Sequence, residues 1–275
     1  MEDAHVPVPE AEPLGVFWWR GVPNFGDAIT PLIVGYVAAR PVQHVRPNQA
    51  ELFAIGSILH VARRAVLSGH GPTPTVWGSG VLMPPRRDFV DQVIFAALRG
   101  PITAALLGLE MDTYGDPGLL ISEIITDIPA DRDRIGIVPH HTLVDDPELT
   151  RLLKKDPAYM LIDPRGDPAE ICGQIASCAH IFASSLHGLI IADAYGVANT
   201  WLVPEGQSWL KYHDYAASIG RSMIAPILLE DVPKRVGKPD QDPSAYADGI
   251  ARARAALKQT FPASLRAQTP SPIGA

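Results

Sequence analysis

The sequence predicts an α/β fold made of two Rossmann-like halves, each with a parallel sheet, that face each other across a cleft. Short apolar segments alternate with helical patterns along almost the whole chain, which is typical of βαβ units. A charged segment with a proline, residues 126–134, interrupts this alternation and favours two domains, 14–125 and 132–261. Glycines and polar residues follow most predicted strands, as they do at the ligand-binding edge of such sheets.

The first half is expected to contain six strands and at least two helices. The helix 102–107 begins after Pro101, which suits a first helical turn because that position leaves its N–H unpaired. The other predicted helix covers residues 32–39. The six apolar segments that predict strands are residues 14–20, 42–45, 52–55, 75–77, 93–98 and 111–114.

The second half repeats the pattern with four strands, at residues 135–138, 159–162, 180–183 and 200–203. Helices are expected at 148–155, 169–178 and 186–195, and at 244–260, where Asp242 and Pro243 suit the cap and the first turn. Residues 1–13 and 262–275 are rich in proline and small or polar residues and are expected to be flexible tails.

Composition narrows the class of protein. The 275 residues are 47% apolar and carry a formal net charge of −7, so a nucleic-acid-binding protein, which would more often be basic, is not expected. No apolar segment is long enough to span a membrane, and the acidic N-terminus does not resemble a signal peptide. A cytoplasmic protein is therefore expected. Cys172 and Cys178 match neither a redox nor a metal motif and predict buried, reduced thiols.

Residues 180–196 are the most informative segment. A buried strand leads through Ser184 and Ser185 to Leu186, His187 and Gly188, where an apolar helix begins. Helix starts present free N–H groups and a partial positive charge, which favour an anion. That charge should lower the pKa of His187, and a bound polyanion should raise it, which suits a general acid. The alternative is a core histidine that hydrogen-bonds to the backbone.

Polar residues at the other strand ends should meet at the same cleft, and each also has a structural interpretation. Asn24 and Asp27 either cap a helix or bind acceptor hydroxyls. Arg99, and less clearly Arg165, either lie on the surface or bind a carboxylate or phosphate. His140 either packs or contacts a ligand, and no residue spacing supports a metal site.

Two further segments have the same ambiguity. Residues 78–80, Gly-Ser-Gly, either form a turn or bring backbone close to a ligand. They are neither a dinucleotide fingerprint nor a P-loop, so nucleotide hydrolysis is disfavoured. Residues 211–215, which begin with Lys211, form either the exposed surface of an amphipathic helix, or a lid or helix that packs on the cleft.

Six motifs occur in an order that resembles the polysaccharide pyruvyl transferase family, over roughly residues 14–225. Within that family the chain is similar to the short ketal pyruvyltransferases of bacterial exopolysaccharide synthesis. The most specific motif is Ser-Leu-His-Gly at 185–188, and all six are residues 24–27, 78–80, 99–101, 115–117, 184–188 and 211–215.

The resemblance implies a fold like that of GT-B glycosyltransferases and an enzyme that needs no cofactor. It implies that phosphoenolpyruvate gives its pyruvyl unit to two hydroxyls of one sugar, which yields a cyclic ketal and phosphate. The acceptor would be a saccharide or a lipid-linked oligosaccharide, and the latter would bring the protein to the inner face of the cytoplasmic membrane as a peripheral protein.

The resemblance also implies roles for individual residues. His187 would be the general acid or a phosphate ligand, Arg99 and Arg165 would bind the donor, and Asn24 and Asp27 would address the acceptor. The remaining substrate-binding residues would be Gly26, Gly78, Ser79, Gly80, His140, Ser184, Ser185, Leu186, Gly188 and Lys211. Two alternatives are a GT-B glycosyltransferase that uses a nucleotide sugar and a non-catalytic carbohydrate-binding protein.

Overall fold

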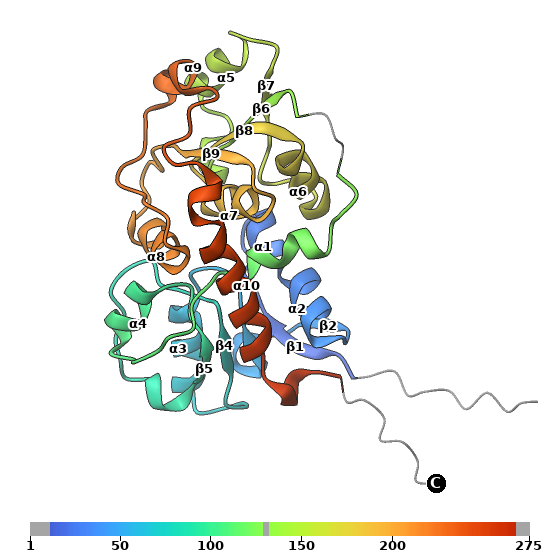
Figure 1. Ribbon diagram of the computed structural model, residues 1–275. Helices are drawn as coiled ribbons and strands as arrows, with labels where there is room; N and C mark the ends of the chain where they lie inside the picture. Colours follow the sequence, from blue (N-terminus) through green and yellow to red (C-terminus); the bar gives the residue numbers. More distant parts are fainter. Residues whose placement is uncertain (1–11, 129–131, 268–275) are drawn as a thin grey trace, which may run out of the picture.

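The computed structural model describes residues 12–128 and 132–267 and contains two parallel sheets flanked by helices (Figure 1). The first sheet has five strands in the order β2-β1-β3-β4-β5, and the second has four in the order β7-β6-β8-β9. Every pair of neighbouring strands is parallel. The predicted α/β class with two parallel-sheet halves is thereby confirmed.

The elements of the first half follow the predicted alternation. Its strands are β1 (Leu14–Phe17), β2 (Val42–His44), β3 (Leu52–Phe53), β4 (Thr75–Trp77) and β5 (Ile94–Ala97). Its helices are α1 (Phe25–Ala28), α2 (Thr30–Ala38), α3 (Leu59–Leu67) and α4 (Pro101–Leu107), with short 3-10 helices η1 (Pro47–Gln49), η2 (Val90–Gln92) and η3 (Pro117–Glu123).

The second half has the same organisation. Its strands are β6 (Arg134–Val138), β7 (Tyr159–Leu161), β8 (Cys178–Ala183) and β9 (Ala198–Trp201). Its helices are α5 (Pro147–Leu153), α6 (Pro168–Ala176), α7 (Leu186–Ala194), α8 (Leu210–Ile219), α9 (Val232–Arg235) and α10 (Ala247–Thr260). The 3-10 helices are η4 (His141–Leu143), η5 (Leu229–Asp231), η6 (Pro243–Tyr246) and η7 (Ala263–Leu265).

The predicted strand at residues 111–114 is wrong. Only Tyr114 pairs with the sheet, through an isolated bridge to Leu98. The chain then turns, because the side chain of Asp116 accepts a hydrogen bond from the N–H of Gly118 and caps η3. A cap followed by Pro117 starts a helical turn rather than extending a strand.

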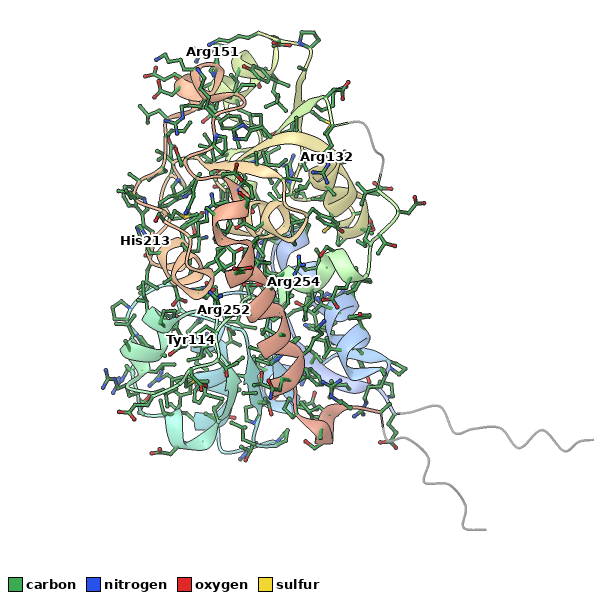
Figure 2. The ribbon with its side chains drawn as sticks, viewed as in Figure 1. Tyr114, Arg132, Arg151, His213, Arg252 and Arg254 are labelled. Atoms are coloured by element: carbon green, nitrogen blue, oxygen red, sulfur yellow. The ribbon has the colours of Figure 1, made fainter. Side chains whose placement is uncertain are left out.

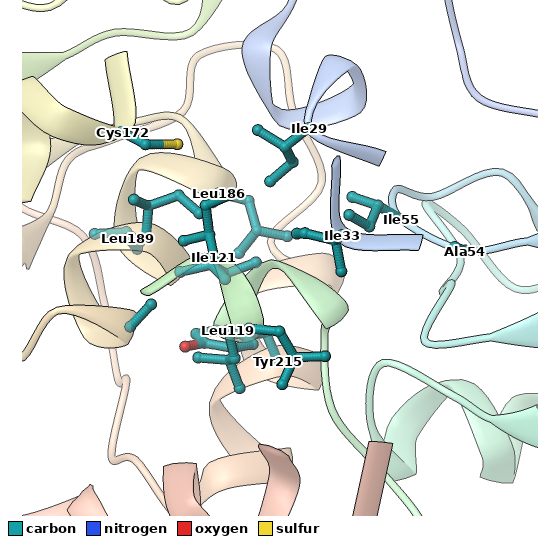
Figure 3. Close-up of a cluster of buried hydrophobic side chains, with 14 of the residues drawn as sticks. Ile29, Ile33, Ala54, Ile55, Leu119, Ile121, Cys172, Leu186, Leu189 and Tyr215 are labelled. Atoms are coloured by element: carbon teal, nitrogen blue, oxygen red, sulfur yellow. The ribbon is translucent and has the colours of Figure 1, made fainter. Parts of the chain in front are cut away.

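The two halves share one hydrophobic core. Ile33 of α2 and Ile55, just after β3, pack with Leu119 of η3, Leu189 of α7 and Tyr215 of α8, and all five are fully buried (Figure 3). A continuous core of this kind resists separation of the halves, because separating them would return apolar surface to water.

Helix α10 connects the halves a second time. It runs beside α8 and η3, and its last turn reaches the first sheet (Figure 1). There the indole N–H of Trp77 donates to the carbonyl of Leu257 at 2.9 Å, and the Phe261 ring contacts the Trp77 ring edge-on. Earlier on the helix, Arg254 donates to the carbonyl oxygens of Leu119 and of Ala194 in α7 (Figure 2).

The predicted C-terminal flexible tail starts too early. Residues 262–267 are ordered: Leu265 is buried in the core, and Arg266 donates to the carbonyl of Val37 at 2.7 Å. The expectation of flexibility for residues 1–11 and 268–275 concerns parts of the chain outside the described residues. The division into domains 14–125 and 132–261 stays a prediction.

Two predictions from composition concern the described residues directly. Among them, no helix has the length and apolar character needed to cross a bilayer. Cys172 and Cys178 are both buried and unpaired with each other, as predicted. Burial raises the pKa of Cys172 to about 12 and that of Cys178 to about 11, so both stay thiols at neutral pH.

Candidate active site

A pocket of about 320 Å³ lies where the carboxyl ends of strands from both sheets meet. This volume is within the range of small-ligand sites. Its walls come from both halves: Trp19, Asn24, Asp27, Gly56, Ser57, Ile58, His60, Leu82 and Arg99 from the first, and His140, Ser185, Leu186, His187 and Lys211 from the second.

The structure sorts the predicted site residues into three groups. One group lines the pocket: Asn24, Asp27, Arg99, His140, Ser185, Leu186, His187 and Lys211. A second group lies outside its lining but contacts residues close to it: Gly26, Gly78, Ser79, Gly80, Ser184 and Gly188. Arg165 belongs to neither group.

Asn24 and Asp27 form the floor on the side of the first sheet. Asn24 caps α1 by accepting from the N–H of Gly26, and its amide donates to Asp27 at 2.9 Å. Gly56 has a φ of +99°, and a Cβ there would lie 2.8 Å from the Asp27 carboxyl. Burial raises the pKa of Asp27 to about 7, against the opposing effects of the Asn24 hydrogen bond and of Lys211. Asn24 therefore caps the helix, while the carboxyl of Asp27 is available to a ligand in the pocket.

Arg99 is fully buried and held on three sides. Its Nε donates to Asp214 at 3.1 Å, its Nη1 to the Ser57 hydroxyl at 2.7 Å and its Nη2 to the Val81 carbonyl at 3.0 Å. A Cβ at Gly80 would lie 2.4 Å from the guanidinium carbon. The glycine at position 80 therefore makes room for Arg99, whose Nη1 side is the one near Ser57 and the pocket.

The Gly-Ser-Gly turn at residues 78–80 shapes the loops behind the pocket. The hydroxyl of Ser79 donates to the Gly56 carbonyl at 2.7 Å and fixes the loop after β3. Gly78 has a φ of +87°, and a Cβ there would lie 2.2 Å from the ring of Pro117. The structure thus favours the interpretation of this motif as a turn with close backbone packing.

His187 sits in the first turn of α7, beneath Ser185, which caps the helix. It is 8% exposed, and a Cβ at Gly26 would lie 1.9 Å from its Nδ1. Its Nε2 lies 3.9 Å from Oδ2 of Asp116. Burial, reinforced by the charges of Lys211 and Arg99, lowers the pKa of His187 to about 3, so the imidazole is neutral in the empty pocket.

The backbone just before α7 is fixed by a small hydrogen-bond network. The Ser184 hydroxyl accepts from the N–H of His140 at 2.8 Å, and the Tyr212 hydroxyl donates to the Ser184 carbonyl at 2.5 Å. Gly188 packs against β6 and β8, where a Cβ would lie 3.0 Å from Val138. Burial, with the neighbouring His141 and Lys211, lowers the pKa of His140 to about 4.

Lys211 is the second cation of the pocket and comes from the first turn of α8. Its Nζ lies 3.4 Å from the Gln207 side-chain oxygen and 5.2 Å from the centre of the Tyr212 ring. Burial, and then the charge of Arg99, lower its pKa to about 8. Lys211 is thus mostly charged at neutral pH, and a bound anion would stabilise that charge.

The structure does not bring Arg165 to the pocket, and its donor-binding role stays a prediction. Arg165 does not line the pocket; its guanidinium is half-exposed and binds Asp163 at 2.7 Å and Asp145 at 3.3 Å. Asp163 is two residues away, so the chain supplies a local partner that neutralises the arginine. The acidic residue two positions before Arg165 was the sign in the sequence of this local ion pair.

Two carboxylates at the site were not predicted as functional. Asp116 faces His187, and Asp214 accepts from Arg99 and from both the N–H and the hydroxyl of Thr103. In the sequence each of them stands within a polar motif, residues 115–117 or 211–215, and nothing there distinguishes it as a functional residue. Within the described parts of the chain, no group of three potential metal ligands occurs.

Comparison with known proteins identifies the segment that carries most of these groups. The sequence model of the family "Polysaccharide pyruvyl transferase" matches residues 95–205. The chain is 28% identical over 172 residues to "Uncharacterized protein L143" of Acanthamoeba polyphaga mimivirus. That match covers 57% of this chain and 58% of the relative, so the chain spans little more than half of that protein.

Two solved structures are similar at low sequence identity. One is titled "Crystal Structure Analysis of the Glycotransferase of kitacinnamycin", with a TM-score of 0.39 and 13% identity, covering 86% of this chain and 76% of that one. The other is "Spinosyn Rhamnosyltransferase SpnG", with a TM-score of 0.39 and 12% identity, covering 90% and 95%.

The family match spans the β5–β9 region, which includes Arg99, Asp116, His140 and His187. These residues come from both halves and meet at one pocket or directly behind it. The match over residues 95–205 confirms the resemblance to the polysaccharide pyruvyl transferase family that the motifs predicted.

Proposed function

We propose that this protein transfers the pyruvyl unit of phosphoenolpyruvate onto two hydroxyls of one sugar, forming a cyclic ketal and releasing phosphate. The observation that carries the proposal is the make-up of the pocket: two buried cations, Arg99 and Lys211, share it with His187 and Asp27. The acceptor is a saccharide or a lipid-linked saccharide. Since the donor is a cytoplasmic metabolite, the reaction belongs in the cytoplasm or at the inner membrane face.

The donor is a small, strongly anionic molecule with a carboxylate and a phosphate. Arg99 and Lys211 both line the pocket, and so do Ser185 and His187 at the positive N-terminal end of α7. Because both cationic side chains are buried, they attract an anion more strongly than they would on the surface. The local positive field thus opposes the net charge of −7 of the whole chain.

The proposed reaction balances without water or a cofactor. A proton adds to the methylene carbon of phosphoenolpyruvate, and one sugar hydroxyl attacks the resulting oxocarbenium-like carbon and loses its proton. The carbon–oxygen bond to phosphate then breaks, and phosphate leaves with the electron pair. The second hydroxyl attacks the same carbon and loses its proton, which closes the ketal.

His187 is the residue that we assign to the proton transfer to carbon. In the empty pocket it is neutral, because burial and the two cations lower its pKa to about 3. A bound polyanion cancels the charges of Lys211 and Arg99 and favours the imidazolium form. The histidine therefore becomes an acid when the donor is present, as general acid catalysis requires.

Asp27 is suited to accept a proton from a sugar hydroxyl. It lies in α1 of the first half, whereas His187 lies in α7 of the second, and both line the pocket; the pKa of Asp27, about 7, lies near the working pH. Asn24 holds the carboxyl through its amide and can orient a hydroxyl with its remaining hydrogen-bonding capacity. Acid and base would then come from different halves.

A nucleotide-sugar donor is less well matched to the structure. A second cavity of about 210 Å³ lies in the C-terminal half and has four carboxylates in its lining, from Asp146, Glu148, Glu205 and Glu230. These charges would repel a diphosphate. Calorimetric titration with phosphoenolpyruvate and with common nucleotide sugars separates the two functions, and we expect heat only from the former.

The direct test is product analysis with the full chain. We expect phosphate release from phosphoenolpyruvate that depends on a saccharide acceptor, and a product heavier by one pyruvate less one water. The variant His187→Gln should lose about 10²–10⁴ in turnover, and His70→Gln, at an exposed histidine, should keep wild-type turnover. Consumption of a nucleotide sugar with no phosphate release from phosphoenolpyruvate would overturn the proposal.

A further inference from the structure

We propose that Asp116 is a positioning residue for His187. In this proposal Nε2–H of His187 donates to Oδ2 of Asp116, so that Nδ1 is the nitrogen that exchanges a proton with the substrate. This assignment rests on the proposed function for the identity of the substrate, and on geometry alone for the direction of the ring. Asp116 comes from the first half and His187 from the second, so the pair forms only when the halves are docked.

The first line of evidence is a pair of unsatisfied atoms. Oδ2 of Asp116 and Nε2 of His187 are both buried and without a hydrogen-bond partner, and they face each other at 3.9 Å. An unpaired buried polar group is costly, yet here a donor and an acceptor stand together. The gap exceeds a normal hydrogen bond by about 1 Å, and catalytic hydrogen bonds that are long in the free enzyme often tighten in the substrate complex.

The carboxylate is locked in this direction. Asp116 is fully buried, and its Oδ1 accepts from the N–H of Gly118 at 2.9 Å as the cap of η3. Gly118 in turn lies close to α7, where a Cβ would come within 3.0 Å of Ile190. With one oxygen held and the helix pressed against α7, the other oxygen has no path to solvent and points at His187.

The ring is equally constrained on its other side. Nδ1 lies over Gly26, where a Cβ would come within 1.9 Å, and the Phe25 ring meets the imidazole edge-on at 6.5 Å. Within the described residues, no hydrogen bond to Nδ1 occurs. Since His187 lines the pocket and Nε2 is buried, Nδ1 is the nitrogen available to a ligand.

The charges around the ring give Asp116 a specific task. Lys211 and Arg99 disfavour the imidazolium, and Asp27 is the carboxyl among the residues that line the pocket. When the donor neutralises the two cations, the Asp116 carboxylate remains as the charge beside Nε2 and favours the imidazolium. The proton on Nε2 stays on the ring throughout, directed at the Asp116 carboxylate. The proton on Nδ1 moves to the methylene carbon and is replaced by the proton of one attacking hydroxyl, while Asp27 accepts the proton of the other and passes it to the departing phosphate.

The kinetic test uses Asp116→Asn, which keeps the shape and removes the charge. We expect kcat to fall by about 10²-fold with little change in the KM for phosphoenolpyruvate. The alkaline limb of the kcat profile should move to lower pH by about one unit, because the imidazolium loses its countercharge. Asp193→Asn is the matched control. Asp193 is a buried carboxylate on α7, the helix that carries His187, and it is bound by Arg221 and Tyr215. Its loss should lower Tm without moving the alkaline limb.

A second measurement tests the ring direction without any substrate. In ¹⁵N imidazole spectra of the free protein, the His187 signals, identified by their loss in His187→Gln, should show the tautomer protonated at Nε2. The tautomer protonated at Nδ1, or an unmoved alkaline limb in Asp116→Asn, would overturn the proposal. Failure of the proposed function would look different: no turnover of phosphoenolpyruvate by the wild type, whatever the tautomer.

Discussion

Arg99 and Asp214 form an ion pair that joins the two halves with no access to water. Nε of Arg99, from the first half, lies 3.1 Å from Oδ2 of Asp214 on α8, and both side chains are 0% exposed. A Cβ at Gly100 would lie 1.9 Å from the backbone oxygen of Asp214, so the two backbone segments are in direct contact here. Arg99 therefore both lines the pocket and forms a contact that exists only when the two halves are docked.

Asp214→Ala should destabilise the protein strongly. Removing one partner of a buried ion pair costs about 3–5 kcal/mol, and the Arg99 guanidinium and the Thr103 N–H would lose their acceptor. Urea unfolding would measure the loss. The control is Asp88→Asn, which breaks the more exposed pair with Arg63 and should cost no more than about 1 kcal/mol. Equal losses in the two variants would contradict the cross-half role.

Gly26→Ala should abolish activity by moving His187. The added Cβ would lie 1.9 Å from Nδ1, so the ring has to leave its place between Gly26 and Asp116. We expect turnover to fall by about 10²-fold or more in a protein that still folds. Gly35→Ala is the control: its Cβ would approach no atom closer than 3.6 Å, and alanine in helix α2 should stabilise by about 0.5–1 kcal/mol.

The pH profile should have an acid limb near pH 7 caused by Asp27. Burial raises the pKa of this carboxyl to about 7, and the proposed base is active only when ionised, so turnover falls as the pH falls through that value. In Asp27→Asn the limb should disappear along with most of the turnover. Asp112→Asn, at an exposed carboxyl, should leave the limb in place. A limb that persists in Asp27→Asn would assign it to another group.

Lys211→Met should weaken donor binding more than it slows turnover. Nζ is one of the two buried cations of the pocket, so its loss should raise the Kd for phosphoenolpyruvate by about tenfold or more. In the wild type, affinity should also fall above about pH 8, where Lys211 loses its proton. Calorimetry measures both effects, and Lys155→Met, at an exposed lysine, serves as the unchanged control.

The sequence predicted the location of the pocket well, because parallel strands bring their carboxyl ends to one edge. Asn24, Arg99, His140 and His187 are far apart in the chain, yet each follows a strand and each lines the same pocket. The repeated strand–helix pattern also predicted the two parallel sheets. These inferences depend only on local periodicity and on topology.

Part of what the sequence did not predict depends on how the halves dock. Asp116 and Asp214 gain their partners from the opposite half, and no local pattern shows which side chains will meet. Arg165 differs from these two residues: its partner Asp163 is local, and the sequence prediction gave more weight to its position after a strand. Helix α3 was missed although its sequence, Leu59–Leu67, is amphipathic.

Helix α10 has a consequence for how substrates reach the pocket. Arg254 of this helix donates hydrogen bonds to η3 and α7, and the Leu257 carbonyl accepts one from Trp77 of the first sheet. These contacts with both halves oppose a hinge movement that would open and close the pocket. Under the proposed function, the reacting sugar would enter an opening of constant width while the rest of the saccharide stays outside, and the side chains around that opening would discriminate between acceptors.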